Sequence, residues 1–168
     1  MTQLYAHCLP PCVRALKNLA AVLKKGEAFA ETKKIEQSVL LNDRLAPDMF
    51  ALTRQVQIAC DVSKGAAARL SGSENPSFPD SETSFAQLYA RIDRTIDFLH
   101  SVPESAFAGS ETRTITLQTP FGTMEWNGLD YVNSFVLPNV YFHSSMAYAI
   151  LRNNGVELGK QDFLAGGG

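Results

Sequence analysis

The chain has 168 residues, of which 45% are hydrophobic and 19% are charged, and its formal net charge is −2 at pH 7. This balance is typical of a soluble globular protein, and the length favours a single domain over residues 1–168. Because lysines and arginines are scattered rather than clustered, we expect no nucleic-acid partner. No apolar run approaches the roughly 18 residues of a membrane span, so we expect no membrane association.

The chain contains three cysteines, which we interpret as free thiols. A chain of this size needs no disulfide to fold, and an odd number of cysteines indicates a reducing compartment, so we predict a cytoplasmic protein. Cys8 and Cys12 in "HCLPPC" lack the CxxC spacing of redox and metal motifs. We interpret them, like Cys60, as small apolar packing residues.

The first predicted helix carries an apolar stripe from Leu4 to Leu23, at spacings of three and four residues. Pro10 and Pro11 fall inside this stripe. We expect them either to kink the helix or to place its regular part after them. Gly26 is the expected left-handed cap at its end.

The next segments contain two further long helices and their connections. Residues 27–47 predict a short helix or turn and a connector, and a second long helix is predicted from Asp48 to Leu70. Gly72 ends that helix, and the loop "SGSENPSFPDSE" follows. Ser84 and Gln87 match a capping box, which predicts the start of a third helix that Pro103 stops. We interpret His100, in its last turn, as a helix-dipole partner.

The segment "RTITLQTPFGTMEWN", residues 113–127, changes to the alternating period of strands. Pro120 and Gly122 lie where a tight turn needs them, so the segment predicts a small β-hairpin between the third and fourth helices. A lone two-stranded hairpin is marginally stable, so we expect its apolar face to lean on the helices.

The fourth predicted helix spans Asp130 to Asn154, with Pro138 bending or restarting it and Gly155 as its cap. We expect residues 156–168 to form an ordered strap that ends in frayed glycines. Four amphipathic helices of about 20 residues predict an all-α four-helix bundle with a small β-hairpin.

A single histidine lies near the middle of the fourth helix. Val140, His143, Ala147 and Ile150 share one stripe, so His143 faces the bundle interior. A buried imidazole without a partner costs roughly 1–3 kcal/mol, so a hydrogen bond or a metal ion must compensate it. Asn139, one turn earlier, could share whatever His143 contacts.

Two stretches, "LLNDRLAPDMFALTRQVQIACD" and "PNVYFHSSMAYAILRNNGVELGKQDFL", resemble a bacterial domain-of-unknown-function family related to the DinB/YfiT-like metalloenzyme superfamily. The resemblance extends over nearly the whole chain, including the hairpin. It implies a DinB/YfiT-like four-helix bundle and, because relatives of this type tend to dimerise, a homodimer.

In DinB-like proteins, three histidines hold a divalent metal: one from the second helix and an HxxxH pair on the fourth. By this resemblance His143 takes the second position of the pair, twelve residues before Gly155, and Asn139 takes the first. The predicted second helix contains no histidine, so His143 is one of three expected ligands. An asparagine oxygen is a poor ligand for zinc or nickel, and any carboxylate ligand would have to come from Asp48 or Asp61.

Two functions stay open from the sequence. The first is small-molecule binding without a cofactor, at a degenerate DinB-like site formed by His143, Asn139, Trp126 and Tyr131. The second, which the resemblance implies, is a metal-dependent transferase or hydrolase with zinc or nickel at His143. His143 as a metal-free general base is a further option, and whether the chain is an enzyme is left open.

Overall fold

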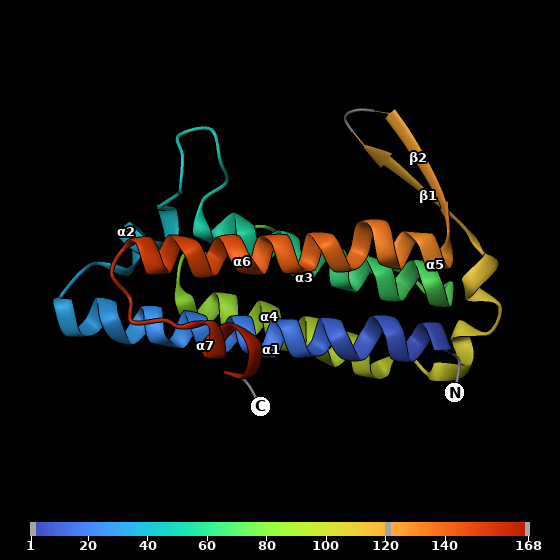
Figure 1. Cartoon of the computed structure of the whole chain (residues 1–168), viewed down its shortest axis with the longest axis horizontal. Helices are drawn as coiled ribbons and strands as arrows, with labels where there is room; N and C mark the ends of the chain where they lie inside the picture. Colours follow the sequence, from blue (N-terminus) through green and yellow to red (C-terminus); the bar gives the residue numbers. More distant parts are fainter. Residues whose placement is uncertain (1–2, 120–121, 167–168) are drawn as a thin grey trace.

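The computed structural model describes residues 3–119 and 122–166. Its elements lie side by side along one long axis, with the two strands standing away from the helices (Figure 1). In chain order they are α1 (Gln3–Lys33), α2 (Gln37–Asn42), α3 (Leu52–Ser71), α4 (Phe85–Ser101), η1 (Glu104–Phe107), η2 (Ser110–Thr112), β1 (Thr114–Thr119), β2 (Gly122–Asn127), α5 (Gly128–Tyr131), η3 (Val132–Val136), α6 (Leu137–Asn153) and α7 (Lys160–Ala165).

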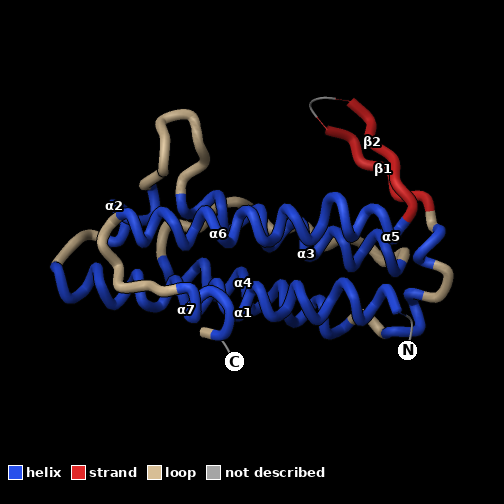
Figure 2. The backbone as a smooth tube through the Cα atoms, in the orientation of Figure 1, coloured by secondary structure: helices blue, strands red, loops and turns tan. Residues whose placement is uncertain are grey.

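The four longest helices, α1, α3, α4 and α6, pack around one hydrophobic core (Figure 2). Helix α3 packs against α6 and α4, and α1 packs against the same two helices. The prediction of a mostly helical chain with one small hairpin is therefore confirmed. In the described part of the chain, no helix is both long and apolar enough to cross a membrane.

Three of the predicted helix boundaries are confirmed by their caps. Helix α3 ends at Gly72, with φ of 77°, and the segment after α6 turns at Gly155, with φ of 93°, both in the left-handed region that favours glycine. Helix α4 begins where predicted, because the Ser84 hydroxyl accepts a hydrogen bond from the Gln87 N–H at 3.2 Å. The second half of the predicted capping box differs, since the Gln87 side chain accepts from the Thr83 N–H instead.

Helix α1 departs from the predicted boundaries at both ends. It begins at Gln3, runs through Pro10 and Pro11, and ends at Lys33, so the prolines do not delay its start. The predicted cap at Gly26 is wrong, because Gly26 is buried inside the helix. A Cβ at Gly26 would lie 2.8 Å from a methyl carbon of Leu151, so the glycine permits α1 and α6 to approach closely.

Helix α3 begins at Leu52, four residues later than predicted. The segment before it forms a loop whose base is closed by a hydrogen bond from the Leu52 N–H to the Asp43 carbonyl at 2.9 Å. This loop, residues 43–51, projects from the same side of the helices as the hairpin (Figure 1). It carries Phe50, whose side chain is 55% exposed.

The predicted fourth helix is continuous but irregular. Helix α5 leads into η3, a π-helical turn over Val132–Val136, and then into α6. Pro138 lacks the N–H that an α-helix needs at that position, which is a physical reason for the widened turn just before it. The expected bend near Pro138 therefore takes the form of a π-helical insertion.

The hairpin is antiparallel, with Ile115 opposite Trp126 and Leu117 opposite Met124. Ile115 is buried, but Met124 is 44% exposed, so only the base of the hairpin packs on the helices. The rest projects away from them (Figure 2), which corrects the expectation that its apolar face leans on the bundle. The predicted turn at Pro120 lies outside the described residues.

The tail after α6 returns across α1 as predicted for a strap. Its helix α7 is held by a hydrogen bond from the Asn18 amide to the Phe163 carbonyl at 3.0 Å. An ion pair of 2.6 Å between Lys25 and Asp162 adds a second attachment. Leu164, in the same helix, remains 52% exposed.

Candidate functional site

His143 is buried as predicted, with 8% of its surface exposed, and its partner is Gln55 of α3. The His143 Nδ1 and Gln55 Oε1 atoms are 2.7 Å apart. Gln55 is itself 1% exposed and donates from its Nε2 to the Phe50 carbonyl at 3.0 Å. A chain of hydrogen bonds thus runs from the loop before α3 through α3 to α6.

The direction of this chain fixes the tautomer of His143. The Phe50 carbonyl can only accept, so the NH₂ group of Gln55 faces it and the amide oxygen faces the imidazole. Nδ1 must therefore carry the proton, which leaves the Nε2 lone pair free. No described residue hydrogen-bonds to Nε2. This atom is not one of the fully buried polar atoms that lack a partner, so it is in contact with solvent.

The imidazole is neutral at pH 7. Burial, together with the positive charge of Arg54, lowers the pKa of His143 from its ordinary value of 6.5 to about 4. Phe142 lies against the ring, with centroids 5.2 Å apart in an edge-to-face arrangement. The group that His143 offers is a neutral hydrogen-bond acceptor beside an exposed aromatic ring.

Asn139 does not share the hydrogen bond of His143, which corrects the expected His–Asn pair. Its amide nitrogen donates to the Phe135 carbonyl one turn earlier, at 2.6 Å. The Asn139 amide is thus bound to the backbone of its own helix segment and not to the imidazole. Within the described residues the Asn139 Oδ1 atom accepts no hydrogen bond, so it is a second acceptor on the same helix.

Trp126 and Tyr131 form an aromatic cluster with Phe135, with centroid distances of 5.3–5.7 Å. Tyr131 is fully buried, and its hydroxyl accepts from the Arg69 guanidinium at 3.2 Å. Trp126 is half-buried at the base of the hairpin. Tyr131 precedes His143 by twelve residues, about 18 Å along a helix, so the cluster packs the hairpin base rather than surrounding the imidazole.

The residues present do not fit the metal site that the resemblance implies. Among the described residues, no group of three or more His, Cys, Asp or Glu side chains could hold a metal ion. Besides His143, the nearby side chains are the neutral amides of Gln55 and Asn139, which suit zinc and nickel poorly. Asp61 pairs with Arg91 at 2.9 Å and is not available to the imidazole.

The cysteines are all buried and free. Burial raises the pKa of Cys60 to about 12, so its thiol stays protonated and packs as a small apolar group. The pKa of Cys8 is also raised, by its hydrogen bond with Cys12 and by burial. Neither Cys8 nor Cys60 is therefore activated as a nucleophile or ligand.

Comparison with known proteins identifies the family. The family profile described as "Domain of unknown function (DUF1993)" matches residues 4–164. The chain belongs to the DUF1993 family. No curated protein matches it.

A solved structure connects this DUF1993 protein to the DinB group. The crystal structure of a DinB family member protein from Shewanella denitrificans is 44% identical in sequence, with a TM-score of 0.89. The match covers 96% of this chain and 92% of that chain. The resemblance to a DinB-related family of unknown function is thereby confirmed.

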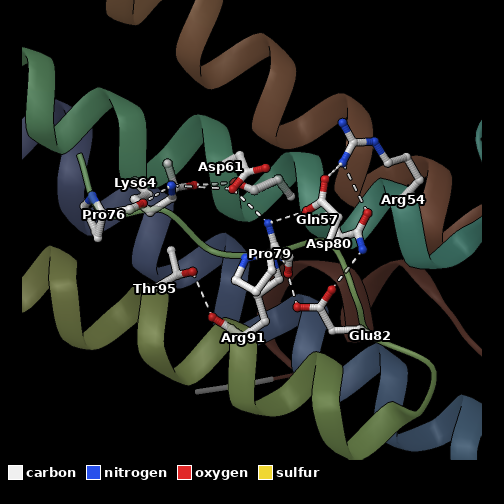
Figure 3. Close-up of polar contacts among 12 residues, drawn as sticks. Arg54, Gln57, Asp61, Lys64, Pro76, Pro79, Asp80, Glu82, Arg91 and Thr95 are labelled. Carbon is white, nitrogen blue, oxygen red and sulfur yellow. Dashed lines mark hydrogen bonds and ion pairs between the residues drawn. The ribbon is translucent and has the colours of Figure 1, made fainter.

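The DUF1993 chain also contains a buried charge cluster that the sequence analysis did not identify (Figure 3). The Arg91 side chain of α4 is 1% exposed and contacts Asp61 of α3 at 2.9 Å. It also contacts Asp80 and Glu82 of the segment between α3 and α4, each at 2.9 Å, and donates to the Pro79 carbonyl. One guanidinium thus joins two helices and the loop between them.

Two effects oppose each other in this cluster. Burial is the largest single effect and opposes the ionisation of both Arg91 and Glu82, but the hydrogen bonds and opposite charges around them together outweigh it. The pKa of Glu82 is therefore lowered and the pKa of Arg91 raised. Phe78 of the same loop lies under the charged groups of Lys64 and Arg94, at 4.9 and 4.2 Å. The cluster fixes the loop, and we assign it a structural role.

We predict that Arg91→Met lowers the free energy of unfolding by about 3 kcal/mol, because it leaves the Glu82 carboxylate, only 11% exposed, without its charged partner. Lys25→Gln is the control, since it removes an ion pair whose lysine is 50% exposed and should cost less than about 1 kcal/mol. Urea denaturation of both variants measures the difference. Equal, small losses would contradict the assigned role of Arg91.

His143→Leu should lower the free energy of unfolding by about 1–3 kcal/mol, because it leaves the buried Gln55 oxygen without a donor. The double variant Gln55→Leu/His143→Leu should recover most of that loss. A double-mutant cycle by thermal or urea unfolding gives the coupling. Additive effects of the two single changes would show that the hydrogen bond contributes nothing.

Acidification should destabilise the protein through His143. Between pH 6.5 and 4 the unfolded chain binds a proton that the folded imidazole does not, so stability falls as pH decreases through this range. The contribution is about 3 kcal/mol at most for a pKa displaced this far. Unfolding curves from pH 7 to 4 measure it, with the double leucine variant as reference. Parallel pH profiles for the two proteins would contradict the lowered pKa.

Proposed function

We propose that this DUF1993 protein binds a small organic molecule at His143, without a metal ion or other cofactor. The observation that carries the proposal is the hydrogen bond from His143 Nδ1 to Gln55, which leaves the Nε2 lone pair free at the protein surface. A buried imidazole held in one tautomer by a second residue is a group prepared for a ligand.

The neighbouring residues suggest the chemical class of this ligand. His143 Nε2 and Asn139 Oδ1 are acceptors, so a ligand with O–H or N–H donors suits them. Phe142 and Phe50, 52% and 55% exposed, offer apolar contact nearby. Arg54, whose charge acts on His143, disfavours a cation. We infer a neutral or anionic molecule that carries hydrogen-bond donors and an apolar part.

We place this site within one domain, residues 1–168, with the DinB/YfiT-like four-helix bundle arrangement. The pairwise packing of α1, α3, α4 and α6 and the similarity to a DinB family member support this arrangement. In this proposal the role of Trp126 and Tyr131 is to pack the base of the hairpin against η3. The proposal leaves open whether binding is followed by a reaction.

The alternative, a metal-dependent transferase or hydrolase, has less support because only one of three expected ligands is present. Metal analysis of untagged protein separates the two. The proposal expects less than stoichiometric zinc and nickel. Stoichiometric metal that disappears in His143→Ala would overturn it in favour of the metalloenzyme.

The binding itself is tested with a thermal-shift and NMR screen of small acids, thiols and hydroxyl compounds at pH 7. Compounds that bind at His143 should lose binding in Gln55→Leu/His143→Leu and retain it in His100→Gln, which changes an exposed histidine on another helix. Binding that the double leucine variant retains in full would refute the assignment of the site.

Homodimer formation, expected from the resemblance, stays a prediction. Several large apolar side chains are exposed, including Phe50 and Phe142 at more than half of their surface, and they offer area for self-association. Light scattering of the purified protein over a range of concentrations tests this. A constant monomer mass would contradict it.

A further inference from the structure

Helix α1 borders two cavities whose lining residues do not include His143. One, of about 540 Å³, is lined by residues of α1, α4 and α7; the other, of about 550 Å³, is lined by residues of α1, α6 and α7. They share Pro10, Arg14, Asn18 and Leu164. Because they share these residues, the two cavities adjoin each other along α1. They lie on the N-terminal side of the point where α7 crosses α1 (Figure 1). Each is within the size range of small-molecule sites.

The first cavity combines basic groups with apolar walls. Arg14, Lys17 and His100 line it, and all three are exposed. Within the described residues none of them has an ion-pair or hydrogen-bond partner, and no carboxylate lines either cavity. The apolar walls are formed by side chains of α1, α4 and the tail: Leu9, Val13, Leu99 and Leu164.

The second cavity contains a polar group that lacks a partner. Ser144 of α6 lines it and is 3% exposed, and its hydroxyl makes no hydrogen bond within the described structure. A buried hydroxyl without a partner is unfavourable, and a ligand oxygen would satisfy it. The rest of this cavity is formed largely by prolines, alanines and the Tyr141 and Phe163 rings.

We propose that these adjoining cavities bind a soluble, singly charged amphiphile, a carboxylate with an aliphatic chain. The carboxylate is held by Arg14 and Lys17. Both residues lie on α1, line the first cavity and have no ion-pair partner among the described residues. The aliphatic chain lies on the apolar walls and against Leu164, which borders both cavities and is 52% exposed without a ligand. This site is independent of the one proposed at His143.

Decanoate is the probe, measured below its micelle concentration by isothermal titration calorimetry on the full chain. Decan-1-ol and decylamine carry the same chain with a neutral and a positive headgroup. Decanoate should bind at least about tenfold more tightly than either, because a charge-assisted hydrogen bond contributes roughly that factor. Hexanoate should bind more weakly than decanoate because it buries less apolar surface.

The site is assigned with charge-matched variants. Arg14→Gln/Lys17→Gln should weaken decanoate binding at least about tenfold. Lys24→Gln/Arg152→Gln removes the same charge from exposed residues that line neither cavity and should leave binding unchanged. Leu164→Ser should weaken decanoate more than hexanoate, which tests the chain-binding wall.

Four outcomes would overturn the proposal. They are no decanoate binding at millimolar concentration, equal binding of decanoate and decan-1-ol, equal effects of the two double variants, and binding to phosphatidylglycerol vesicles in place of free decanoate. The variants that assign this site leave His143 and Gln55 unchanged, so a failure here leaves the proposed function untouched, and the reverse also holds.

Discussion

The hydrogen bond between Gln55 and His143 is the interaction on which the candidate site depends. It crosses from α3 to α6 inside the core and is continued by Gln55 to the backbone of the loop before α3. Because the Phe50 carbonyl at the end of these hydrogen bonds can only accept, the position of each proton in the network is defined. The imidazole is thereby held in one tautomer, with one nitrogen satisfied and the other free, while burial and the charge of Arg54 keep it neutral. An arrangement of this kind is what a metal site or a ligand site requires of its histidine.

The absence of further ligands changes what that histidine can do. In a metal site, two other side chains would complete the coordination, but here the adjacent groups are amides that already hydrogen-bond within the protein. Amide oxygens and a neutral imidazole nitrogen together form a surface of acceptors. This DUF1993 chain thus shares the layout of a DinB family member, and we propose that its acceptors bind an organic hydrogen-bond donor.

Stability comes from a different part of the molecule. Arg91 joins α3, α4 and the connecting loop through three carboxylates, at the cost of burying a charge.

The helix stripes, the caps at Ser84, Gly72 and Gly155, and the hairpin were predictable because each depends on residues close together in sequence. The continuous α1 was not, since packing against α6 keeps it helical through two prolines despite the lost backbone donors. That His143 is buried followed from its stripe, but its partner did not.

Gln55 lies 88 residues away, and a glutamine on a helix gives no sequence signal of whether it faces the core or solvent. The same holds for Arg91, whose position beside Ile92 on a predicted helix looked like an ordinary solvated charge. The partner of a buried polar group depends on how elements far apart in the sequence pack together. The periodicity of a single helix carries no information about that packing.

The tautomer of His143 is the most direct test of the account. Nitrogen-15 NMR of the histidine rings at pH 7 separates protonated from unprotonated ring nitrogens, with exposed His100 as an internal reference. The account predicts a single His143 tautomer with the proton on Nδ1 and a free Nε2. A proton on Nε2, or the averaged signals of a freely exchanging imidazole, would contradict it.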